Sequence, residues 1–177
     1  MKFSELAKYR QSVRDYEDRP LEKEKINRCI ESTRLSPSAN NAQPWKFIVV
    51  DEPKLKNEVA SAVSGGGMNK FSAQAPVIIA VVLEKRDVLS SIASVMQNKE
   101  YSLIDVGIAV NQFCLQAADL GLGTCIIGWF NEKKVKKLLN VPCGKRMPLV
   151  ITMGYSKSPI RNKTRKPIEE MSSWNKY

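Results

Sequence analysis

Two groups of basic residues could bind an anion, and the first lies near the start of the 177-residue chain. It is the segment Arg10-Gln11-Ser12-Val13-Arg14, in which two guanidinium groups flank a serine. A guanidinium group binds two phosphate oxygens at once, and a serine hydroxyl or a nearby backbone amide adds a further donor. The segment can therefore bind phosphate, although an isolated segment of this kind is more often a solvated turn between helices.

The second basic group is Lys163, Arg165 and Lys166, within a polar tail that follows Gly154. Basic tails are usually only solvated, so this group is weak evidence alone. The two groups would form one phosphate site if the tail folded back over the N-terminal helix. The sequence permits this arrangement.

A third candidate is the loop from Pro37 to Trp45, which contains Ser38 and Asn40 and leads into an apolar segment. Its hydroxyl and carboxamide groups both donate and accept hydrogen bonds, as an uncharged heteroaromatic ring with imide edges requires. The alternative is a plain turn in which Trp45 anchors the core.

Composition narrows the chemistry that these residues could support. The chain has no histidine, which excludes Ser-His-Asp and Cys-His catalysis and histidine metal sites. We therefore expect a bound cofactor to supply any chemistry. The four cysteines show no CxxC spacing and lie in or beside apolar segments, which predicts buried thiols rather than a zinc site or disulfides.

The net charge of +10 would suit a polyanion, but the basic residues are spread along the chain without a nucleic-acid-binding motif. We therefore expect no nucleic-acid partner and a surface that attracts phosphorylated cofactors.

The longest apolar stretch, 75–83, is too short to cross a bilayer, and the N-terminus lacks a secretory signal. The expected location is the cytoplasm, without membrane contact.

The pattern of apolar residues predicts one domain in which helices and strands alternate. The expected strands are 46–50, 76–83, 124–127 and 149–153, and the β-branched run 76–83 should be central and covered on both faces. The expected helices are 3–9, 22–34, one opened by Pro53 with Asp51 as its cap, 103–120, and one capped by Asn131. The 103–120 helix is apolar almost all round, which predicts burial, in the core or at a subunit interface.

This order implies a three-layer α/β or α+β domain. A Rossmann fold would fit the alternation, but no GxGxxG joins a first strand to a helix. Residues 84–102 are mixed and polar, and are a candidate lid.

Four segments together resemble the FMN-dependent nitroreductase family: YRQSVRDY, SPSANNAQPW, DVGIAVNQFCLQAADLGLGTCIIGWF and KTRKPIEEM. They occur in that family's order and cover nearly the whole chain. The resemblance implies an α+β, nitroreductase-like three-layer fold with a central, mostly antiparallel sheet and an intertwined homodimer. Residues 1–154 would form the FMN-binding domain, and residues 155–177 would complete the phosphate site and pack on the partner subunit.

The resemblance also implies roles for residues of this chain. Arg10, Ser12, Lys163, Arg165 and, with them, Arg14 would bind the phosphate and ribityl side of FMN. Pro37, Ser38 and Asn40 would approach the flavin from the other subunit. Backbone amides near Ile127 and Gly128 would face its N5 and O4 edge, where charge develops on reduction. Arg14, and Asn69 or Lys70, would lie near its N1 and O2 edge.

The implied function is an FMN-dependent NAD(P)H oxidoreductase with ping-pong transfer of electrons to nitroaromatic or quinone-like acceptors. Two alternatives stay open: a flavin-holding protein with little turnover, and specialised flavin chemistry on a single metabolite. The chain is short for the family, so 84–102 is the only candidate for an inserted helix that shapes the substrate pocket. The sequence selects neither the physiological acceptor nor NADH over NADPH.

Overall fold

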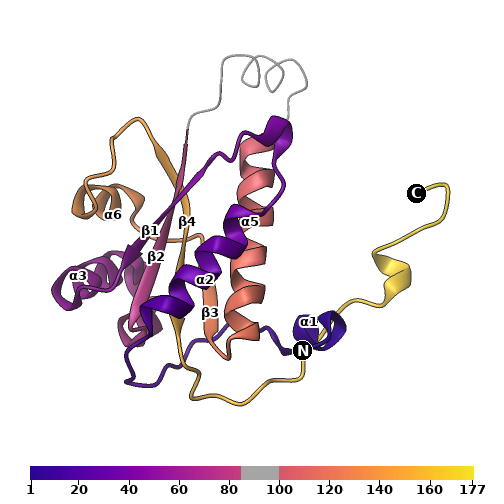
Figure 1. Ribbon diagram of the computed structural model, residues 1–177, viewed down its shortest axis with the longest axis horizontal. Helices are drawn as coiled ribbons and strands as arrows, with labels where there is room; N and C mark the ends of the chain where they lie inside the picture. The colour runs from indigo at the N-terminus through magenta and orange to yellow at the C-terminus, as the bar shows by residue number, and fades with distance from the viewer. Residues whose placement is uncertain (85–99) are drawn as a thin grey trace.

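A computed structural model describes residues 1–84 and 100–177 and centres on a four-stranded sheet (Figure 1). Its strands are β1 (Trp45–Val50), β2 (Val77–Leu83), β3 (Gly123–Ile127) and β4 (Arg146–Gly154). Their spatial order is β1-β2-β4-β3, and all three pairings are antiparallel. The α+β expectation with an antiparallel sheet is confirmed.

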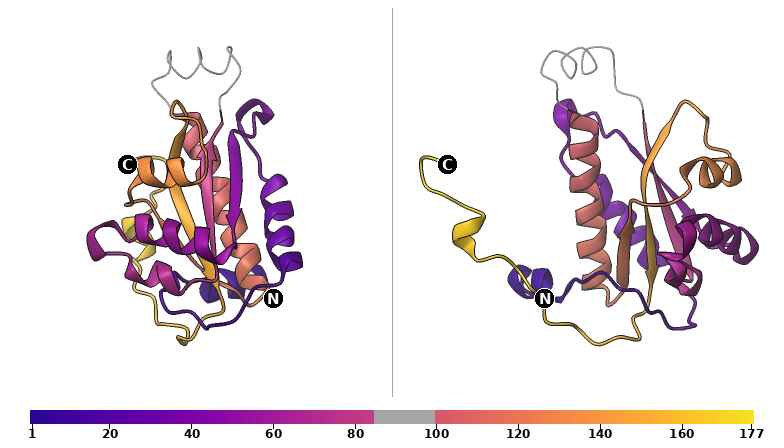
Figure 2. Two further views of the ribbon diagram at one scale, coloured as in Figure 1. Left: turned by 90° about the vertical axis from the view of Figure 1, so that its left-hand side faces the viewer. Right: turned by 180° about the vertical axis from the view of Figure 1, so that it is seen from behind.

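Helices cover both faces of this sheet and make a three-layer domain (Figures 1 and 2). One face carries α2 (Lys23–Arg34) and α5 (Tyr101–Asp119), and the other carries α3 (Pro53–Val63) and α6 (Glu132–Leu138). Side chains of β2 alternate between the two cores, as successive residues of a strand must. Val77, Ile79 and Val81 face α2 and α5, whereas the intervening residues face α3 and α6. The prediction of a central strand covered on both faces is confirmed.

The remaining elements lie around this body. Helix α1 (Phe3–Tyr9) lies near the C-terminal end of α5, where the Met1 amino group is 3.7 Å from Asp119. Short 3-10 turns complete the chain: η1 (Ala39–Asn41), η2 (Gly65–Gly67), η3 (Lys70–Gln74) and η4 (Ile168–Glu170). After β4 the chain passes below the sheet to α1, and its last residues extend away from the body (Figure 2).

The N-terminal caps of α3 and α6 can be compared with those predicted from the sequence. Asn131 caps α6 as expected, since its side chain accepts a hydrogen bond from the Lys134 amide at 3.0 Å. The expected Asp51 cap of α3 is wrong. Glu52 caps this helix, and its carboxylate accepts from the amides of Lys54 and Leu55 at 3.0 and 2.6 Å. Pro53 is the first helical residue, so the cap position is the residue directly before it.

Helix α5 is buried on one side only in the single chain. Val106, Val110 and Phe113 pack on the sheet, but Ile104 and Ile108 are 54% and 40% exposed. They line an open groove of about 730 Å³ between α1 and α5. The expectation of burial is therefore confirmed for the side that faces the sheet, and burial of the outer side at a subunit interface stays a prediction.

The four cysteines differ in their burial. Cys29, Cys114 and Cys125 are buried free thiols, as expected. Cys143 is exposed, because it follows Pro142 in the turn between α6 and β4 rather than in a core element.

Within residues 1–84 and 100–177, no group of side chains could hold a metal ion, and no helix is long and apolar enough to cross a membrane. Most of the candidate lid, 85–99, lies outside the described residues, and α5 begins at Tyr101.

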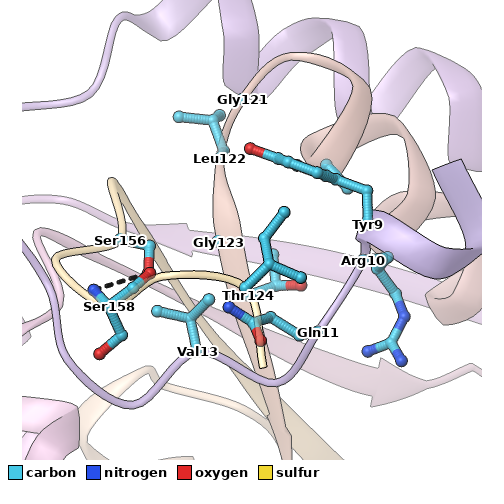
Figure 3. A pocket seen from close by; sticks show the side chains of 12 residues that line it. Tyr9, Arg10, Gln11, Val13, Gly121, Leu122, Gly123, Thr124, Ser156 and Ser158 are labelled. Carbon is cyan, nitrogen blue, oxygen red and sulfur yellow. Dashed lines mark hydrogen bonds between the residues drawn. The ribbon is translucent and has the colours of Figure 1, made fainter. Parts of the chain in front are cut away.

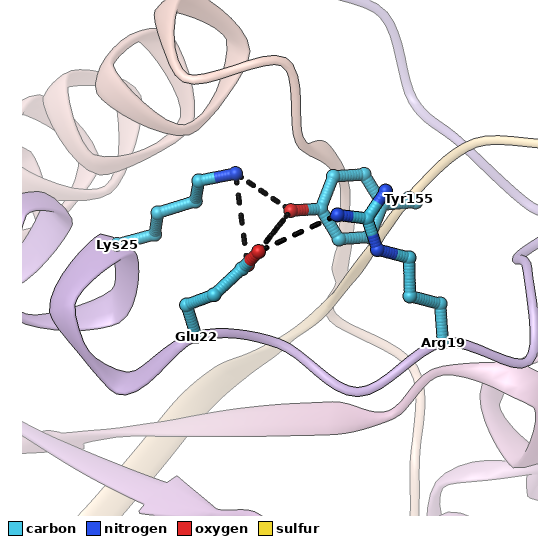
Figure 4. Close-up of polar contacts among 4 residues, drawn as sticks. All are labelled: Arg19, Glu22, Lys25 and Tyr155. Carbon is cyan, nitrogen blue, oxygen red and sulfur yellow. Dashed lines mark hydrogen bonds and ion pairs between the residues drawn. The ribbon is translucent and has the colours of Figure 1, made fainter.

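A polar cluster fixes the start of α2 against the chain that leaves β4 (Figure 4). The Tyr155 hydroxyl lies 2.6 Å from Lys25 Nζ and 2.7 Å from Glu22 Oε2, and the Arg19 guanidinium stacks 3.9 Å from the ring centroid. The hydrogen bond from Tyr155 is the main reason that the pKa of Glu22 is lowered. Because Tyr155 directly follows β4, this cluster helps to set the path of the tail.

Candidate functional site

The N-terminal basic segment is held in an extended path beside the sheet. The Val13 amide donates to the Thr124 carbonyl at 2.9 Å, and Ser12 forms a parallel bridge with Thr124 on β3. Tyr16 is buried, and its hydroxyl donates to the Val13 carbonyl at 2.9 Å and lies 2.8 Å from Thr152 Oγ1. Burial raises the pKa of this phenol, so it stays neutral. The backbone that carries Arg10 to Arg14 is therefore fixed to the sheet.

Two glycines allow this close approach. A Cβ atom on Gly123 would lie 2.5 Å from Val13 Cγ2, and one on Gly154 would lie 2.7 Å from Tyr16 Cδ1. Real Cβ atoms essentially never come so close to other atoms, so a larger residue at either position would force its neighbours to shift. Figure 3 shows Val13 beside Gly123 and Thr124, at a small cavity of about 50 Å³ under the start of the basic segment.

The tail returns to this segment and closes the far side of the site. Arg161 donates through its backbone amide to Gln11 Oε1 at 3.0 Å and through Nη2 to the Ser12 carbonyl at 2.7 Å. Gln11 in turn donates to the Pro159 carbonyl at 3.1 Å. Lys163 Nζ bonds to the carbonyl of Lys8 at the end of α1. Lys163 and Arg165 thus come together with the N-terminal basic group within one chain. Lys166, the third member of the second group, does not line the cavity between them and lies 3.9 Å from Glu170 Oε2.

The N-terminal segment and the tail together line a cavity of about 260 Å³ that is rich in positive charge. Its lining residues are Arg10, Gln11, Ser12, Arg14, Arg161, Asn162, Lys163 and Arg165. In the described part of the chain, none of its five cations pairs with a carboxylate. Desolvation, and then the charge of Arg10, lowers the pKa of Lys163. Such uncompensated charge favours the binding of an anion.

From this cavity the outer edge of β3 leads to Gly128. The Thr124 carbonyl faces outward, because it accepts from Val13 rather than from β4. Backbone groups alternate along a strand, so those of Ile126 also face this outer edge, whereas those of Ile127 face β4. Gly128 follows β3 directly and is exposed. The next residue, Trp129, accepts at its carbonyl a hydrogen bond from Asn69 Nδ2 at 2.8 Å.

A glycine turn therefore lies beside the end of β3. All three residues of Gly65-Gly66-Gly67 have positive φ angles, which glycine adopts without strain. Lys70 follows this turn at the start of η3 and is exposed, and its Cε would lie 3.3 Å from a Cβ on Gly67. Phe71, the residue after Lys70, contacts Arg14 of the cationic cavity: its ring centroid is 5.9 Å from the guanidinium carbon. Hence the cationic cavity, the β3 edge and the 65–70 turn form one continuous strip.

The loop of Pro37, Ser38 and Asn40 lies elsewhere in the single chain. The Ala39 amide donates to the Asp105 carboxylate at 3.2 Å, so the loop lies near the N-terminal end of α5. The cationic cavity lies near the other end, beside α1. A helix of 19 residues is about 28 Å long, so the structure does not bring this loop to the cavity of its own chain.

Comparison with known proteins tests the resemblance. The family model described as the nitroreductase family matches residues 7–67 and 65–155. The chain belongs to the nitroreductase family. A relative from Streptococcus pyogenes, named as an NAD(P)H nitroreductase, is 30% identical over 97% of this chain and 98% of its own length. An oxygen-insensitive NADPH nitroreductase of Helicobacter acinonychis is 27% identical over 85% of each chain.

Solved structures agree with this membership. A nitroreductase family protein of Clostridium difficile 630 is 29% identical and covers 100% of both chains with a TM-score of 0.83. An FMN-dependent nitroreductase of Clostridium difficile R20291 is 26% identical, with a TM-score of 0.79 over 97% of this chain and 98% of its own. The nitroreductase fold is therefore present, and membership supports an oxidoreductase activity.

The sequence reading missed three residues of the cationic cavity in this nitroreductase-family protein: Gln11, Arg161 and Asn162. The spacing of Arg161, Lys163 and Arg165 was a usable signal. In an extended segment, side chains two residues apart point to the same side. A basic residue at every second position therefore indicates one positively charged face. The string KTRK does not show this alternation, because it begins at Lys163 and leaves out Arg161.

Proposed function

We propose that this chain binds FMN and acts as an NAD(P)H-dependent oxidoreductase on nitroaromatic or quinone-like acceptors. The observation that carries the proposal is the cavity in which Arg10, Ser12, Arg14, Lys163 and Arg165 meet. The names of the Streptococcus and Helicobacter relatives support the nicotinamide donor, and that of the Clostridium difficile R20291 structure supports FMN.

The donor set fits the phosphate group of FMN. A phosphate monoester carries a charge of about −1.5 to −2 at pH 7 and three acceptor oxygens. Guanidinium forks, a serine hydroxyl and an ammonium group match those oxygens, and the cavity has no carboxylate in its lining. The strand edge from Thr124 to Gly128 spans about 13 Å. This edge gives an attached ring system a path from the cavity to Gly128 and Lys70.

The residues along this strip would position the cofactor and tune its charge. When bound, FMN supplies hydride and electron transfer. Backbone groups near Ile127 and Gly128 would donate to the N5 and O4 edge, with the outward alternation favouring Gly128. Positive charge from Lys70 or Arg14 would stabilise negative charge that develops on the ring. The chain has no histidine to exchange protons near neutral pH, so protons would come from solvent or substrate.

We further propose that the protein works as a homodimer with shared sites. The groove over α5 and the exposed side chains of Ile168, Met171 and Trp174 in the tail would be covered by the partner. Pro37, Ser38 and Asn40 would then reach the flavin of the partner, since they are remote from their own cavity. Residues 1–154 would hold FMN, and 155–177 would complete its phosphate site and pack on the partner.

The test is the visible absorption spectrum of the purified protein, before and after anaerobic addition of NADH or NADPH. Flavin bands that bleach are expected, and parallel initial-velocity lines with a nitroaromatic or quinone acceptor would support the ping-pong order. A colourless protein that takes up no added FMN would overturn the proposal. Bound flavin that does not bleach would favour a flavin-holding protein with little turnover.

A further inference from the structure

Arg161 belongs to the tail half of the cationic cavity and binds the N-terminal half directly. Its Nη2 donates to the Ser12 carbonyl at 2.7 Å, and its Nε lies 3.4 Å from Gln11 Oε1. Its backbone amide also donates to Gln11 Oε1, at 3.0 Å. These bonds join residues about 150 positions apart in the sequence. The side chain thus fixes the backbone of the serine that is a candidate phosphate ligand.

The same guanidinium group keeps a donor available for an anion. Arg161 lines the cavity, and Nη1 has no hydrogen-bond acceptor among residues 1–84 and 100–177. No carboxylate of the described chain pairs with it. An arginine has five N–H donors in a fixed fork, so two nitrogens can bind protein oxygens while the third binds a ligand.

We propose that Arg161 is a specificity-determining residue of the anion site, which selects the phosphorylated flavin over riboflavin. This inference rests on the proposed function. The side chain acts in two ways: its Nη2 and Nε hold Ser12 and Gln11 in place, and its Nη1 faces the phosphate dianion. Lysine would keep the charge but lose the fork, so it cannot do both.

The test compares FMN with riboflavin in binding titrations, followed by flavin fluorescence at fixed salt. We expect Arg161→Gln to weaken FMN binding about tenfold or more, because hydrogen bonds to charged groups are the strong ones. Riboflavin binding should change less than twofold. Arg161→Lys should be intermediate, and added salt should reduce the difference between wild type and Arg161→Gln for FMN.

A matched control is Lys157→Gln, which removes one positive charge from the same tail at an exposed side chain outside the cavity lining. It should bind FMN as the wild type does. A thermal melt of each flavin-free variant shows whether Arg161→Gln is folded. If it is not, Arg161→Lys with the same pair of ligands decides the question.

The outcomes separate this inference from the proposed function. Equal losses for FMN and riboflavin in Arg161→Gln would mean that Arg161 only supports the fold, and would overturn the inference. Unchanged FMN binding would overturn it as well. Both results leave the proposed function standing if the wild type binds FMN. A wild type that binds neither flavin would overturn the proposed function and this inference together.

Discussion

The cationic cavity and the 37–43 loop are built in opposite ways, although both are candidate parts of one flavin site. The cavity is assembled from the two distant basic groups and is complete within one chain. The loop is local in sequence, and its Ala39 amide donates a hydrogen bond to Asp105 on α5. Three of its residues, Asn40, Asn41 and Gln43, have φ angles of 54°, 53° and 45°.

Positive φ angles in residues other than glycine cost free energy and persist only where the surroundings hold them. The cavity shows no such backbone strain in the described residues and instead concentrates like charges. Repulsion between like charges in the cationic cavity would therefore be relieved by a bound anion, whereas the 37–43 loop is held in one strained backbone conformation. The difference suggests distinct roles: the cavity supplies affinity, and the loop supplies shape.

The largest expected effect is on affinity, from the double substitution Arg10→Ala/Lys163→Ala. It removes two candidate phosphate contacts, and charged hydrogen bonds contribute about 1.5–3 kcal/mol each, so FMN affinity should fall at least about 100-fold. Titration with FMN measures this. The control Lys133→Ala/Lys137→Ala removes two exposed charges from α6, on the opposite face of the sheet, and should bind FMN normally. Equal losses in both variants would show only a general charge effect.

Gly123→Ala should disturb the cavity by displacing the segment that packs against this glycine. The new Cβ would overlap Val13 Cγ2, so the segment that carries Ser12 must shift. Overpacking of this kind costs about 1–3 kcal/mol in the free energy of unfolding. Urea denaturation measures the loss, and FMN affinity should fall with it. Gly144→Ala is the matched control, because no atom lies within 4 Å of its added Cβ. A Gly123→Ala variant as stable as the control would contradict the close packing.

A heterodimer would test whether the loop acts across the dimer. One subunit carries Arg10→Ala/Lys163→Ala, and the other carries Asn40→Gly, which keeps the positive φ angle but removes the carboxamide. If sites are shared, tandem-tagged heterodimers contain one intact site of two and should recover about half of the wild-type activity. Each homodimer should remain impaired.

The outcome that would contradict shared sites is a heterodimer no more active than its parent homodimers. Asn41→Gly, at a neighbouring residue with nearly the same φ angle, is the control for changes in the loop backbone.

The smallest effect should be a pH dependence of FMN binding. The pKa of Lys163 is lowered from its usual 10.5 by desolvation and by the neighbouring arginines. Its positive charge is therefore present at neutral pH and is lost as the pH rises through the lowered value, before an ordinary lysine titrates. FMN affinity should fall a few-fold over this range, and Lys163→Arg should remove the fall because arginine keeps its proton. Identical pH profiles for both proteins would argue against a phosphate contact from Lys163.

The sequence predicted the elements well because their signals are local. The β-branched run of β2, Asn131 at its cap and the apolar stripe of α2 each depend on a few adjacent residues. Proximity between distant segments has no such local signal. Neither the bond from Asn69 to Trp129 nor the contact of Arg161 with Ser12 can be read from spacing, because both depend on how the sheet orders its strands. The apolar pattern of α5 left core and interface burial open for a related reason, since such a pattern does not tell which surface covers Ile104 and Ile108.

The distance in sequence between Ser12 and Arg161 has a consequence for biosynthesis. A growing polypeptide leaves the ribosome from its N-terminus, so every helix and strand of the three-layer body emerges before residues 161–165. The N-terminal half of the anion cavity, with Arg10 and Arg14, must therefore wait until this late segment is synthesised. A chain truncated just after β4 would keep all four strands of the sheet but would leave the anion cavity open on one side.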